Sequence, residues 1–537
     1  MNRRSGWFRT LAAALCLCAL LGAPRALAAG GEAKRITGKC AFKVSEGSAD
    51  KLTDGRPGSV WSYSHKDGYV GIRMPKGVEA GWLQVEWLYD PTAYELIEFD
   101  EGMTELRRRD QSCTFPNICS MYELLPETRY LQLKLNAKNQ SISDIAVYSS
   151  GTLPEDVQVW NPPVEKADLM VVSTHQDDEL VFLGGTIPYY AVALKKPTVV
   201  VYMTNCARYR RAEALNALWK MGVRDYPDFI NFEDKKVGSI NAGIRLWGGK
   251  DNILSNLAAR IRRYKPEVIV TQDLNGEYGH NQHKVTARAM KYAIDAAADP
   301  AQYPESAERY GAWQVKKLYH HLYKENQITM DWETKLDSLN GYSPLQVAKI
   351  GMKEHSSQTD AYAVKSHGTY DNSKFGLYFT TVGEDVEKND FLEHIDPDAS
   401  AKYLEEHADE IAARAAAAAA ATPPPEADEE EAEDISEEEM PEEAEAPEEM
   451  EAEAPVEAPA EVQPTAAPAG ETAPRGEPLP IQREGTPAAA PKPTAERGGS
   501  AILPIAMIGL GVAAIGAGGW YAWRTLGAGK RRRCRRR

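Results

Sequence analysis

The sequence predicts an α/β domain with a Rossmann-like, mainly parallel sheet and helices on both faces, preceded by an all-β sandwich. Two observations lead to this prediction. Nearly continuous β-branched runs alternate with helical stretches over residues 165–395, and short alternating runs fill residues 36–160. The chain has 537 residues, which is room for two or three domains at roughly 100–200 residues each.

The first 28 residues have the organisation of a secretory signal peptide. Arg3 and Arg4 precede an apolar run from Trp7 to Leu21, and Ala26-Leu27-Ala28 supplies small residues for cleavage. The apolar run is short for a membrane span, so we expect cleavage. An uncleaved N-terminal anchor is the alternative.

Residues 36–160 contain short runs of alternating apolar and polar residues, such as Trp82–Trp87 and Tyr130–Leu135. Turn residues such as Thr53-Asp54-Gly55 separate them, a pattern typical of half-buried strands in a sandwich. Asn161-Pro162-Pro163 then marks a domain boundary.

The next segment, residues 165–395, changes character. Its apolar runs are nearly continuous, as expected of strands that are buried on both faces; they are Leu169–Ser173, Thr198–Thr204 and Val268–Thr271. Helical stretches lie between and after them, at Arg210–Met221, Ile253–Tyr264 and His283–Ala297. The alternation of strand and helix indicates a parallel sheet.

The C-terminal part is not globular. Residues 399–421 form an alanine-rich predicted helix, and residues 422–500, rich in Pro, Ala and Glu, cannot bury enough apolar surface to fold. We expect the latter to be a disordered, extended stalk. Residues 421–461 hold 19 acidic and no basic residues, so the net charge of −16 becomes +3 without them. The charge of the globular part therefore gives no reason to expect a nucleic-acid partner.

Residues 501–523 form an uncharged apolar run of about the length of a bilayer span, with aromatic residues at its end. Basic residues crowd the tail, residues 524–537, and basic tails stay in the cytoplasm. We expect a single transmembrane helix with the N-terminal domains outside the cell. The sortase signal Leu-Pro-x-Thr-Gly is absent before Ala501, so we expect the anchor to be retained.

Four cysteines would lie outside the cell, where disulfides persist: Cys40, Cys113, Cys119 and Cys206. A Cys113–Cys119 bridge is plausible, but spacing alone leaves the pairing open. The sequence has no Cys-x-x-Cys pair, which argues against a cysteine-rich zinc site.

Two polar clusters follow predicted buried strands. His175-Gln176-Asp177-Asp178-Glu179 comes after the first strand, and Tyr278-Gly279-His280-Asn281-Gln282-His283 comes after Val268–Thr271. Ligands of open α/β sheets bind at the carboxyl ends of strands. His175, Asp178 and His283 offer the nitrogen and oxygen donors of a catalytic zinc site with one open position.

Each cluster alone has a structural alternative. Acids after a strand often favour a helix N-terminus, and a lone His-x-x-His is more often a surface or structural feature than a metal site. Two such clusters at the ends of neighbouring parallel strands are harder to explain without a shared site.

Roughly residues 165–385 resemble the PIG-L/LmbE de-N-acetylases. His175 to Glu179 resembles their His-Pro-Asp-Asp-Glu motif, and Tyr278 to His283 resembles Gly-His-Pro-Asp-His. The resemblance extends to Arg210-x-x-Glu213 and to the segment Ala348–Gln358.

The resemblance implies roles for these residues. His175, Asp178 and His283 would bind Zn²⁺, and Asp177 would be the general base. His280 would be protonated and stabilise the oxyanion. Two further residues, Arg210 and Tyr278, are candidates for substrate contacts, although a solvated helix face is the alternative for Arg210.

The sequence departs from the family motifs at four positions. Gln176 and Asn281 replace prolines, Thr174 replaces a common alanine, and Gln282 replaces an acid. None of these is a proposed ligand. The loss of the acid at 282 puts the orientation of a histidine, and with it rate and pH optimum, in doubt.

Residues 36–160 more weakly resemble discoidin-like sandwiches (coagulation-factor type C), through Ala49–Gly55, Trp61 and Ile142–Tyr148. Many such domains bind glycans through loops at one end. Trp61, Tyr63 and His65 are therefore candidate glycan contacts, with packing of Trp61 in the core as the alternative.

We therefore expect a membrane-anchored, extracellular zinc-dependent hydrolase that removes acetyl from N-acetylglucosamine-like units of a glycan or glycoconjugate. One alternative is a surface glycan-binding protein with an inactive deacetylase fold. The other is an amidase on the same scaffold that cleaves a different amide.

Overall fold

The computed structural model describes residues 31–56, 59–63, 68–91, 93–112, 117–136, 140–205, 208–358 and 363–420. The predicted signal peptide, stalk, transmembrane helix and basic tail lie outside these ranges, as do His65, Cys113 and Cys206. Within the described part of the chain, no helix is both long and apolar enough to cross a membrane. The predictions for those segments stay predictions.

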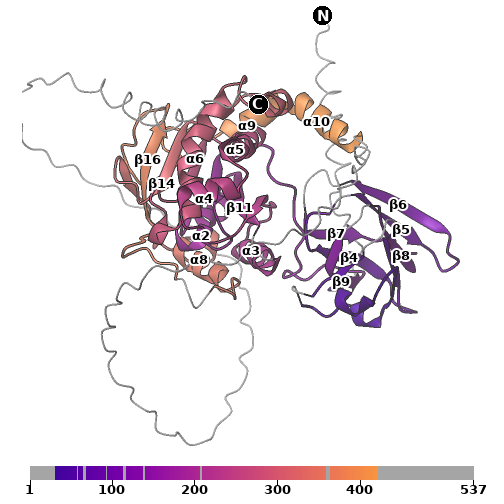
Figure 1. Cartoon of the computed structure of the whole chain (residues 1–537). Helices are drawn as coiled ribbons and strands as arrows, with labels where there is room; N and C mark the ends of the chain where they lie inside the picture. The colour runs from indigo at the N-terminus through magenta and orange to yellow at the C-terminus, as the bar shows by residue number, and fades with distance from the viewer. Residues whose placement is uncertain are drawn as a thin grey trace, which may run out of the picture. The chain divides into compact units, whose positions relative to one another are not determined.

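The N-terminal domain is the expected sandwich of two antiparallel sheets, drawn in indigo and purple in Figure 1. The five-stranded sheet has the order β1-β3-β8-β5-β6, and the four-stranded sheet has the order β2-β9-β4-β7. The strands are β1 (Ala41–Val44), β2 (Trp61–Ser62), β3 (Gly68–Arg73), β4 (Ala80–Trp87), β5 (Ala93–Phe99), β6 (Glu105–Ser112), β7 (Cys119–Glu123), β8 (Tyr130–Leu135) and β9 (Ser141–Ser149).

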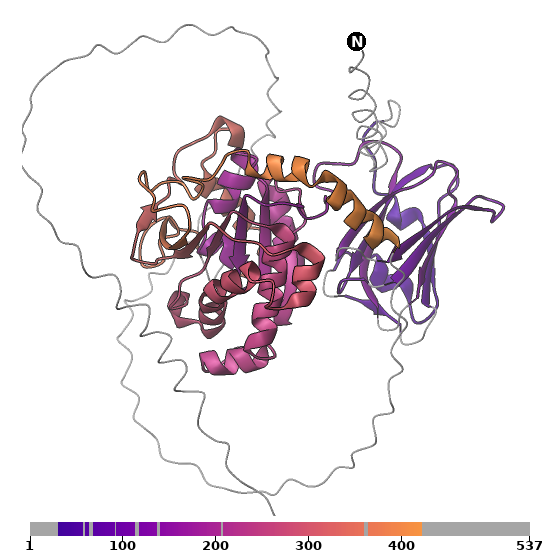
Figure 2. The ribbon, with the colours of Figure 1, turned by 90° about the horizontal axis from the view of Figure 1, so that it is seen from above.

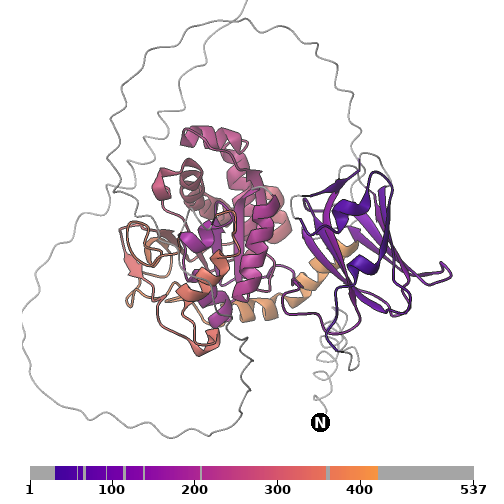
Figure 3. The same ribbon diagram turned by 90° about the horizontal axis from the view of Figure 1, so that it is seen from below.

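Alternation of side chains along these strands produces the core. In β8, Leu131, Leu133 and Leu135 are buried while the residues between them are half-buried, which is the period of two expected of a sandwich strand. Figure 3 shows the strands of this domain from below.

The predicted glycan contacts Trp61 and Tyr63 belong to this core. Their exposed fractions are only 2% and 3%, and their rings stack 5.6 Å apart. The Trp61 indole N–H donates to the carbonyl of Glu46 at 2.8 Å. Burial of both side chains therefore argues against the predicted glycan contacts in this structure. The core alternative for Trp61 fits.

The second domain contains a seven-stranded sheet with the order β12-β11-β10-β13-β14-β16-β15. Its strands are β10 (Leu169–Ser173), β11 (Thr198–Asn205), β12 (Asp228–Glu233), β13 (Val268–Thr271), β14 (Lys317–His321), β15 (Gln327–Thr329) and β16 (Lys374–Thr380). The pairs from β12 to β14 are parallel, whereas β16 pairs antiparallel to both β14 and β15. The sheet is mainly parallel, as predicted.

Helices cover both faces of this sheet. They are α2 (Asp178–Val181), α3 (Arg208–Met221), α4 (Ile240–Leu246), α5 (Lys250–Tyr264), α6 (Asn281–Ala298), α7 (Pro304–Tyr310) and α8 (Pro344–Met352), with a π-helical turn at Pro188–Ala193. Leu169 and Val171 of β10 share a core with α3 and α8, while Met170 and Val172 share the opposite core with α5 and α6. Figure 2 shows this domain from above. Because successive residues of β10 face opposite layers, apolar side chains are needed at both alternating sets of positions, and the strand is apolar up to its final Ser173.

The predicted alanine-rich helix at 399–421 is two helices, α9 (Ala399–Glu406) and α10 (Ala408–Ala420), which meet at His407. The first of them is tied to the sheet, because Ser400 Oγ donates to the Asp168 carboxylate that directly precedes β10.

Candidate metal centre

The strand order reverses at β10, and this reversal determines where a ligand can bind. The chain runs from β10 outward to β11 and β12, then returns to place β13 on the other side of β10. Crossovers that leave in opposite directions open a crevice beyond the carboxyl ends of the two central strands. The two polar clusters predicted from sequence follow these strands, β10 and β13.

Local backbone features bring the clusters together. In the loop after β13, Gly276 has φ +64°, and a Cβ there would lie 2.4 Å from the carbonyl oxygen of His280. Only glycine permits this close return of the chain, which delivers His280 as the residue before α6 and His283 in its first turn. The histidine rings at 280 and 283 lie on the same side, with centroids 4.5 Å apart, as the three-residue spacing predicts.

Three predicted ligand atoms meet at one point. His175 Nδ1 lies 3.0 Å from His283 Nε2, and Asp178 Oδ2 lies 3.1 Å from the first and 3.2 Å from the second. A tetrahedral zinc ion with bonds of about 2.0–2.1 Å would have donor atoms about 3.3 Å apart. The spacing and the chemistry of these donors therefore both fit a zinc ion, and all three residues are buried.

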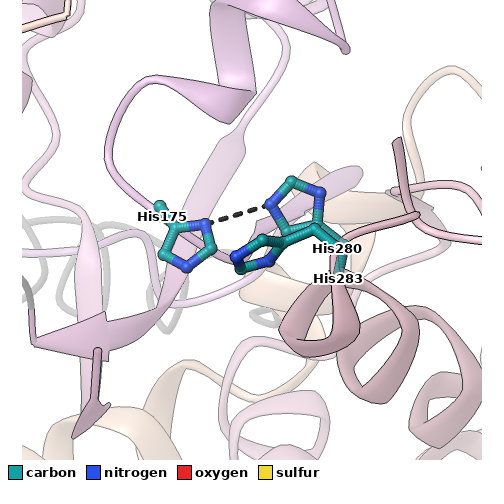
Figure 4. Close-up of side chains that lie close together, drawn as sticks. All are labelled: His175, His280 and His283. Atoms are coloured by element: carbon teal, nitrogen blue, oxygen red, sulfur yellow. Dashed lines mark hydrogen bonds between the residues drawn. The ribbon is translucent and has the colours of Figure 1, made fainter. Parts of the chain in front are cut away.

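His280 is an alternative third donor. Ring nitrogens of His175, His280 and His283 lie within 4.8 Å of one another, and Figure 4 shows the three rings gathered in one place. His280 Nδ1 is buried and has no hydrogen-bond partner among the described residues. The carboxylate of Asp178 is more tightly placed, because it contacts both of the other histidines and also accepts the backbone N–H of His175 at 2.8 Å.

The electrostatics of the three rings differ. Burial opposes charge on His175 and His283, but Asp178 outweighs it and raises the pKa values to about 10 and about 9. Burial, followed by repulsion from these two neighbours, lowers the pKa of His280 to about 4. Without a metal ion, these neighbours therefore favour a neutral His280 ring. That His280 is protonated during the reaction stays a prediction. A neutral ring still has one N–H to donate.

Buried acceptors orient the two histidine ligands. The Nε2–H of His175 donates to Gln282 Oε1 at 3.1 Å, and the Nδ1–H of His283 donates to Glu277 Oε2 at 2.9 Å. Each contact leaves the other ring nitrogen aimed at the shared point. Gln282 thus still orients a histidine although the family acid is missing there. Its own amide N–H is fixed by the carbonyl of Glu233 at 3.0 Å.

Glu277 was not predicted from sequence. Its second oxygen accepts from His321 Nδ1 at 2.9 Å and from the backbone of Asp273 at 3.1 Å. Burial works against ionisation of Glu277, but hydrogen bonds from His283 and His321 lower its pKa to about 2. Glu277 is therefore a carboxylate at neutral pH. Its position directly before the second polar cluster is the sequence signal that could have identified it.

Replacing the Glu277 carboxylate by an amide tests whether Glu277 orients His283 for metal binding. We expect Glu277→Gln to weaken zinc binding about 10–100-fold, because outer partners of metal-bound histidines typically contribute that much. Zinc affinity measured by competition with a chromophoric chelator checks this. The matched control is Glu305→Gln on the exposed surface of α7, which should bind zinc like the wild type. Unchanged affinity in Glu277→Gln would show that the contact does not support a metal.

Asp177 lies next to the point where the three predicted ligand atoms meet, and its backbone conformation is strained. Its φ of +139° is rare for a residue with a side chain, and such strain is found at functional sites. Burial, followed by repulsion from Asp178, raises its pKa to about 7, with Arg210 opposing the rise. A carboxylate whose pKa lies near neutrality can take and return a proton at the pH of use.

Arg210 at the start of α3 contacts the predicted base. Its Nη2 donates to Asp177 Oδ1 at 2.6 Å and to the carbonyl of Gln176 at 2.7 Å. Arg210 thus fixes one carboxylate oxygen of Asp177, and both the base role of Asp177 and a substrate contact of Arg210 stay predictions.

Asp234, immediately after β12, is a second site residue that the sequence did not reveal. Its carboxylate lies 3.4 Å from His175 Nε2 and 3.7 Å from Arg210 Nη1, and the side chain is 30% exposed. The sequence signal that could have identified Asp234 is its position directly after the apolar-rich run Phe229–Glu233, a strand that the sequence pattern did not reveal.

Tyr278 lies at the open side of the cluster. Its ring centroid is 5.6 Å from those of both His280 and His283, and the residue is 47% exposed. This position fits the predicted substrate contact, which stays a prediction.

Comparisons with known proteins agree with the α/β domain. Residues 170–294 match the family model PIG-L, described as GlcNAc-PI de-N-acetylase. A "1D-myo-inositol 2-acetamido-2-deoxy-alpha-D-glucopyranoside deacetylase" of Geodermatophilus obscurus is 28% identical over 28% of this chain and 60% of its own length. A second such deacetylase, from Saccharopolyspora erythraea, is 27% identical over 40% of this chain and 88% of its own. The chain thus spans less than two thirds of the length of the first relative.

Solved structures resemble a smaller part of the chain. The family 32 carbohydrate-binding module of C. perfringens NanJ, in complex with galactose, is 14% identical, with a TM-score of 0.19, and covers 22% of this chain and 98% of its own. That score is too low to carry a conclusion about fold or ligand.

Proposed function

Because residues 170–294 form a domain of the PIG-L family, we propose that the chain is a zinc-dependent de-N-acetylase acting on an N-acetylglucosamine-like unit. The observation that carries this proposal is the meeting of His175, Asp178 and His283 within 3.2 Å, directly beside Asp177. A structural cluster would need neither three converging ligand atoms nor a strained acid next to them.

The names of the relatives support the class of substrate. The two deacetylases from Geodermatophilus and Saccharopolyspora act, by name, on an acetamido sugar linked to inositol. The half-exposed carboxylate of Asp234 and the ring of Tyr278 at the edge of the site suit a polar ring bearing hydroxyl groups. We therefore infer a glycan or glycoconjugate whose N-acetylated sugar enters from this side.

Zinc at this point would supply a Lewis acid that lowers the pKa of water and polarises the acetamide carbonyl. The protein supplies the proton transfers. Arg210 holds Oδ1 of Asp177, which leaves Oδ2 to take the proton of the attacking water. The same carboxyl group can then return the proton to the departing amine. His280 Nδ1, buried and without a partner among the described residues, can meet the developing negative charge when it carries the ring proton.

The cellular setting is part of the proposal. The secretory signal predicted over residues 1–28 and the span predicted over residues 501–523 support a membrane-anchored protein with its enzyme domain outside the cell. On that basis the substrate is a glycan or glycoconjugate at the cell surface.

A substrate panel tests the activity. The purified zinc-loaded protein should release acetate and generate an equal amount of free amine from at least one N-acetylglucosaminyl compound, such as the inositol-linked sugar of the relatives. Release of a larger acid without acetate would instead support the amidase alternative. No product from any amide, with zinc bound, would support the binding-protein alternative.

Zinc binding should also be coupled to proton release. Asp178 raises the pKa values of His175 and His283, which favours protonation of these rings when no metal is bound, and zinc must displace the protons on the ligand nitrogens. We therefore expect apparent zinc affinity to rise with pH above neutrality. Calorimetry in buffers of different ionisation enthalpy measures the proton count. An uptake of zinc without proton release at pH 7 would contradict this electrostatic picture.

A further inference from the structure

A second buried cluster of ionisable groups lies next to Asp177 and contributes none of the proposed ligand atoms. Glu179, Tyr202 and His355 are each 0% exposed. His355 Nε2 lies 3.4 Å from Glu179 Oε1, and the pKa of Tyr202 is raised well above its usual value by burial and then by the Glu179 carboxylate. None of these groups can touch a substrate, so the proposed reaction leaves them unexplained.

Glu179 is connected directly to the proposed base. Its Oε2 accepts the backbone N–H of Asp177 at 2.8 Å, and its Oε1 faces His355. One carboxylate therefore joins the strained residue to a side chain from a distant part of the chain. The contact is not an ordinary helix cap, because Asp177, which precedes α2, makes no capping hydrogen bond with its own side chain.

The strained backbone of Asp177 needs such support. A φ of +139° persists only where surrounding contacts prevent relaxation. Arg210 holds the side chain and the preceding carbonyl, but the Asp177 N–H, the group that a change of φ would redirect, is held by Glu179. Loss of that contact would let the carboxylate turn away from the shared ligand point.

His355 is itself fixed by the residues that follow it. Glu213 on α3 accepts from the hydroxyls of Ser356 and Ser357, both at 2.7 Å, and from the Ser357 N–H at 2.9 Å. Burial opposes a charge on His355, but Glu179 outweighs it and raises the pKa of the ring above its usual value. The late segment thus places the His355 ring, whose protonated form Glu179 favours, against the Glu179 carboxylate.

We propose that Glu179 and His355 form a positioning pair that holds the backbone of Asp177 in the conformation in which its carboxylate serves as the base. The expected loss of turnover rests on the proposed function. The expected change in the backbone of Asp177 rests on the contacts alone. Glu179 and His355 act through Asp177 and are not catalytic residues.

The kinetic test compares Glu179→Gln, Glu179→Ala, His355→Gln and the double variant of Gln at both positions. Each Gln substitution should lower kcat about 10–100-fold, the usual effect of supporting contacts, while KM and zinc content stay within about twofold of the wild type. Glu179→Ala should be worse than Glu179→Gln, because glutamine keeps an oxygen for the Asp177 N–H. The double variant should be no slower than the slower single variant, because the two residues act as one unit.

Surface substitutions serve as matched controls. His394→Gln and Glu305→Gln remove the same types of group at exposed positions and should keep wild-type kcat. Wild-type kcat in both Gln variants of the pair, or multiplicative losses in the double variant, would overturn the proposal. Loss of zinc in proportion to activity would also overturn it, because the pair would then support the metal and not the base.

A structural measurement keeps the proposal testable if the activity itself is absent or Glu179→Ala does not fold. In a crystal structure of His355→Gln we expect the Asp177 φ to leave the positive region or the Arg210–Asp177 contact to break. An unchanged Asp177 would refute the positioning role. A wild-type protein that binds zinc but releases no acetate would refute the proposed function instead, so the two failures can be told apart.

Discussion

Asp177→Asn should lower kcat by about a hundredfold to ten-thousandfold, the range that a positioned general base contributes, while zinc stays bound. Asparagine keeps the size of the side chain and an oxygen to face Arg210. It cannot accept the proton of the attacking water at neutral pH. The pKa of about 7 for Asp177 also predicts that kcat/KM of the wild type falls as the pH drops below 7, since the base is then protonated. This fall should be absent from the residual activity of the variant.

Steady-state kinetics and metal content, measured on the same preparation, check this result. Asp251→Asn at the exposed start of α5 is the matched control and should retain full activity. If Asp177→Asn kept the wild-type rate with zinc bound, the assignment of the base would be wrong.

Asp178→Ala should weaken zinc binding by more than about a hundredfold and abolish activity at ordinary zinc concentrations, because loss of a ligand exceeds the roughly 10–100-fold effect of an outer partner. The carboxylate also contacts both His175 and His283, so its removal takes away a group that fixes the two rings around the ligand point.

His280→Ala separates the two possible ligand sets. If Asp178 is the third ligand, His280→Ala should keep zinc and lose turnover, since His280 then only meets the developing charge. The opposite result, zinc lost in His280→Ala and kept in Asp178→Ala, would show that three histidines hold the metal. Equilibrium zinc titration of both variants gives the answer.

The sequence predicted the central strands and the site because both depend on local patterns. The run Leu169–Ser173 is apolar at every position before its final serine, and the same residues form β10, because a strand between two helical layers leaves no position for a charge. The polar residues that interrupt such runs had to lie at the strand ends. That reasoning placed His175 and His283 together correctly.

Features that depend on contacts between distant residues could not be predicted. Asp234 and His321 reach the site or its supports from β12 and β14, strands that the sequence pattern did not reveal. The protonation of His280 depends on two charged neighbours that only the fold brings together. Trp61 was a candidate glycan contact through the discoidin-like resemblance, with core packing as the alternative, and the sequence alone could not say which way its ring faces.

The most direct test of the account is acetate release as a function of zinc loading. The purified full-length protein is stripped of metal with a chelator and titrated with zinc in the presence of an N-acetylglucosaminyl substrate. The account predicts no acetate release before zinc is added and a rise to a plateau at one zinc ion per chain. Acetate release that is unaffected by stripping, or no acetate at any zinc loading across the substrate panel, would contradict it.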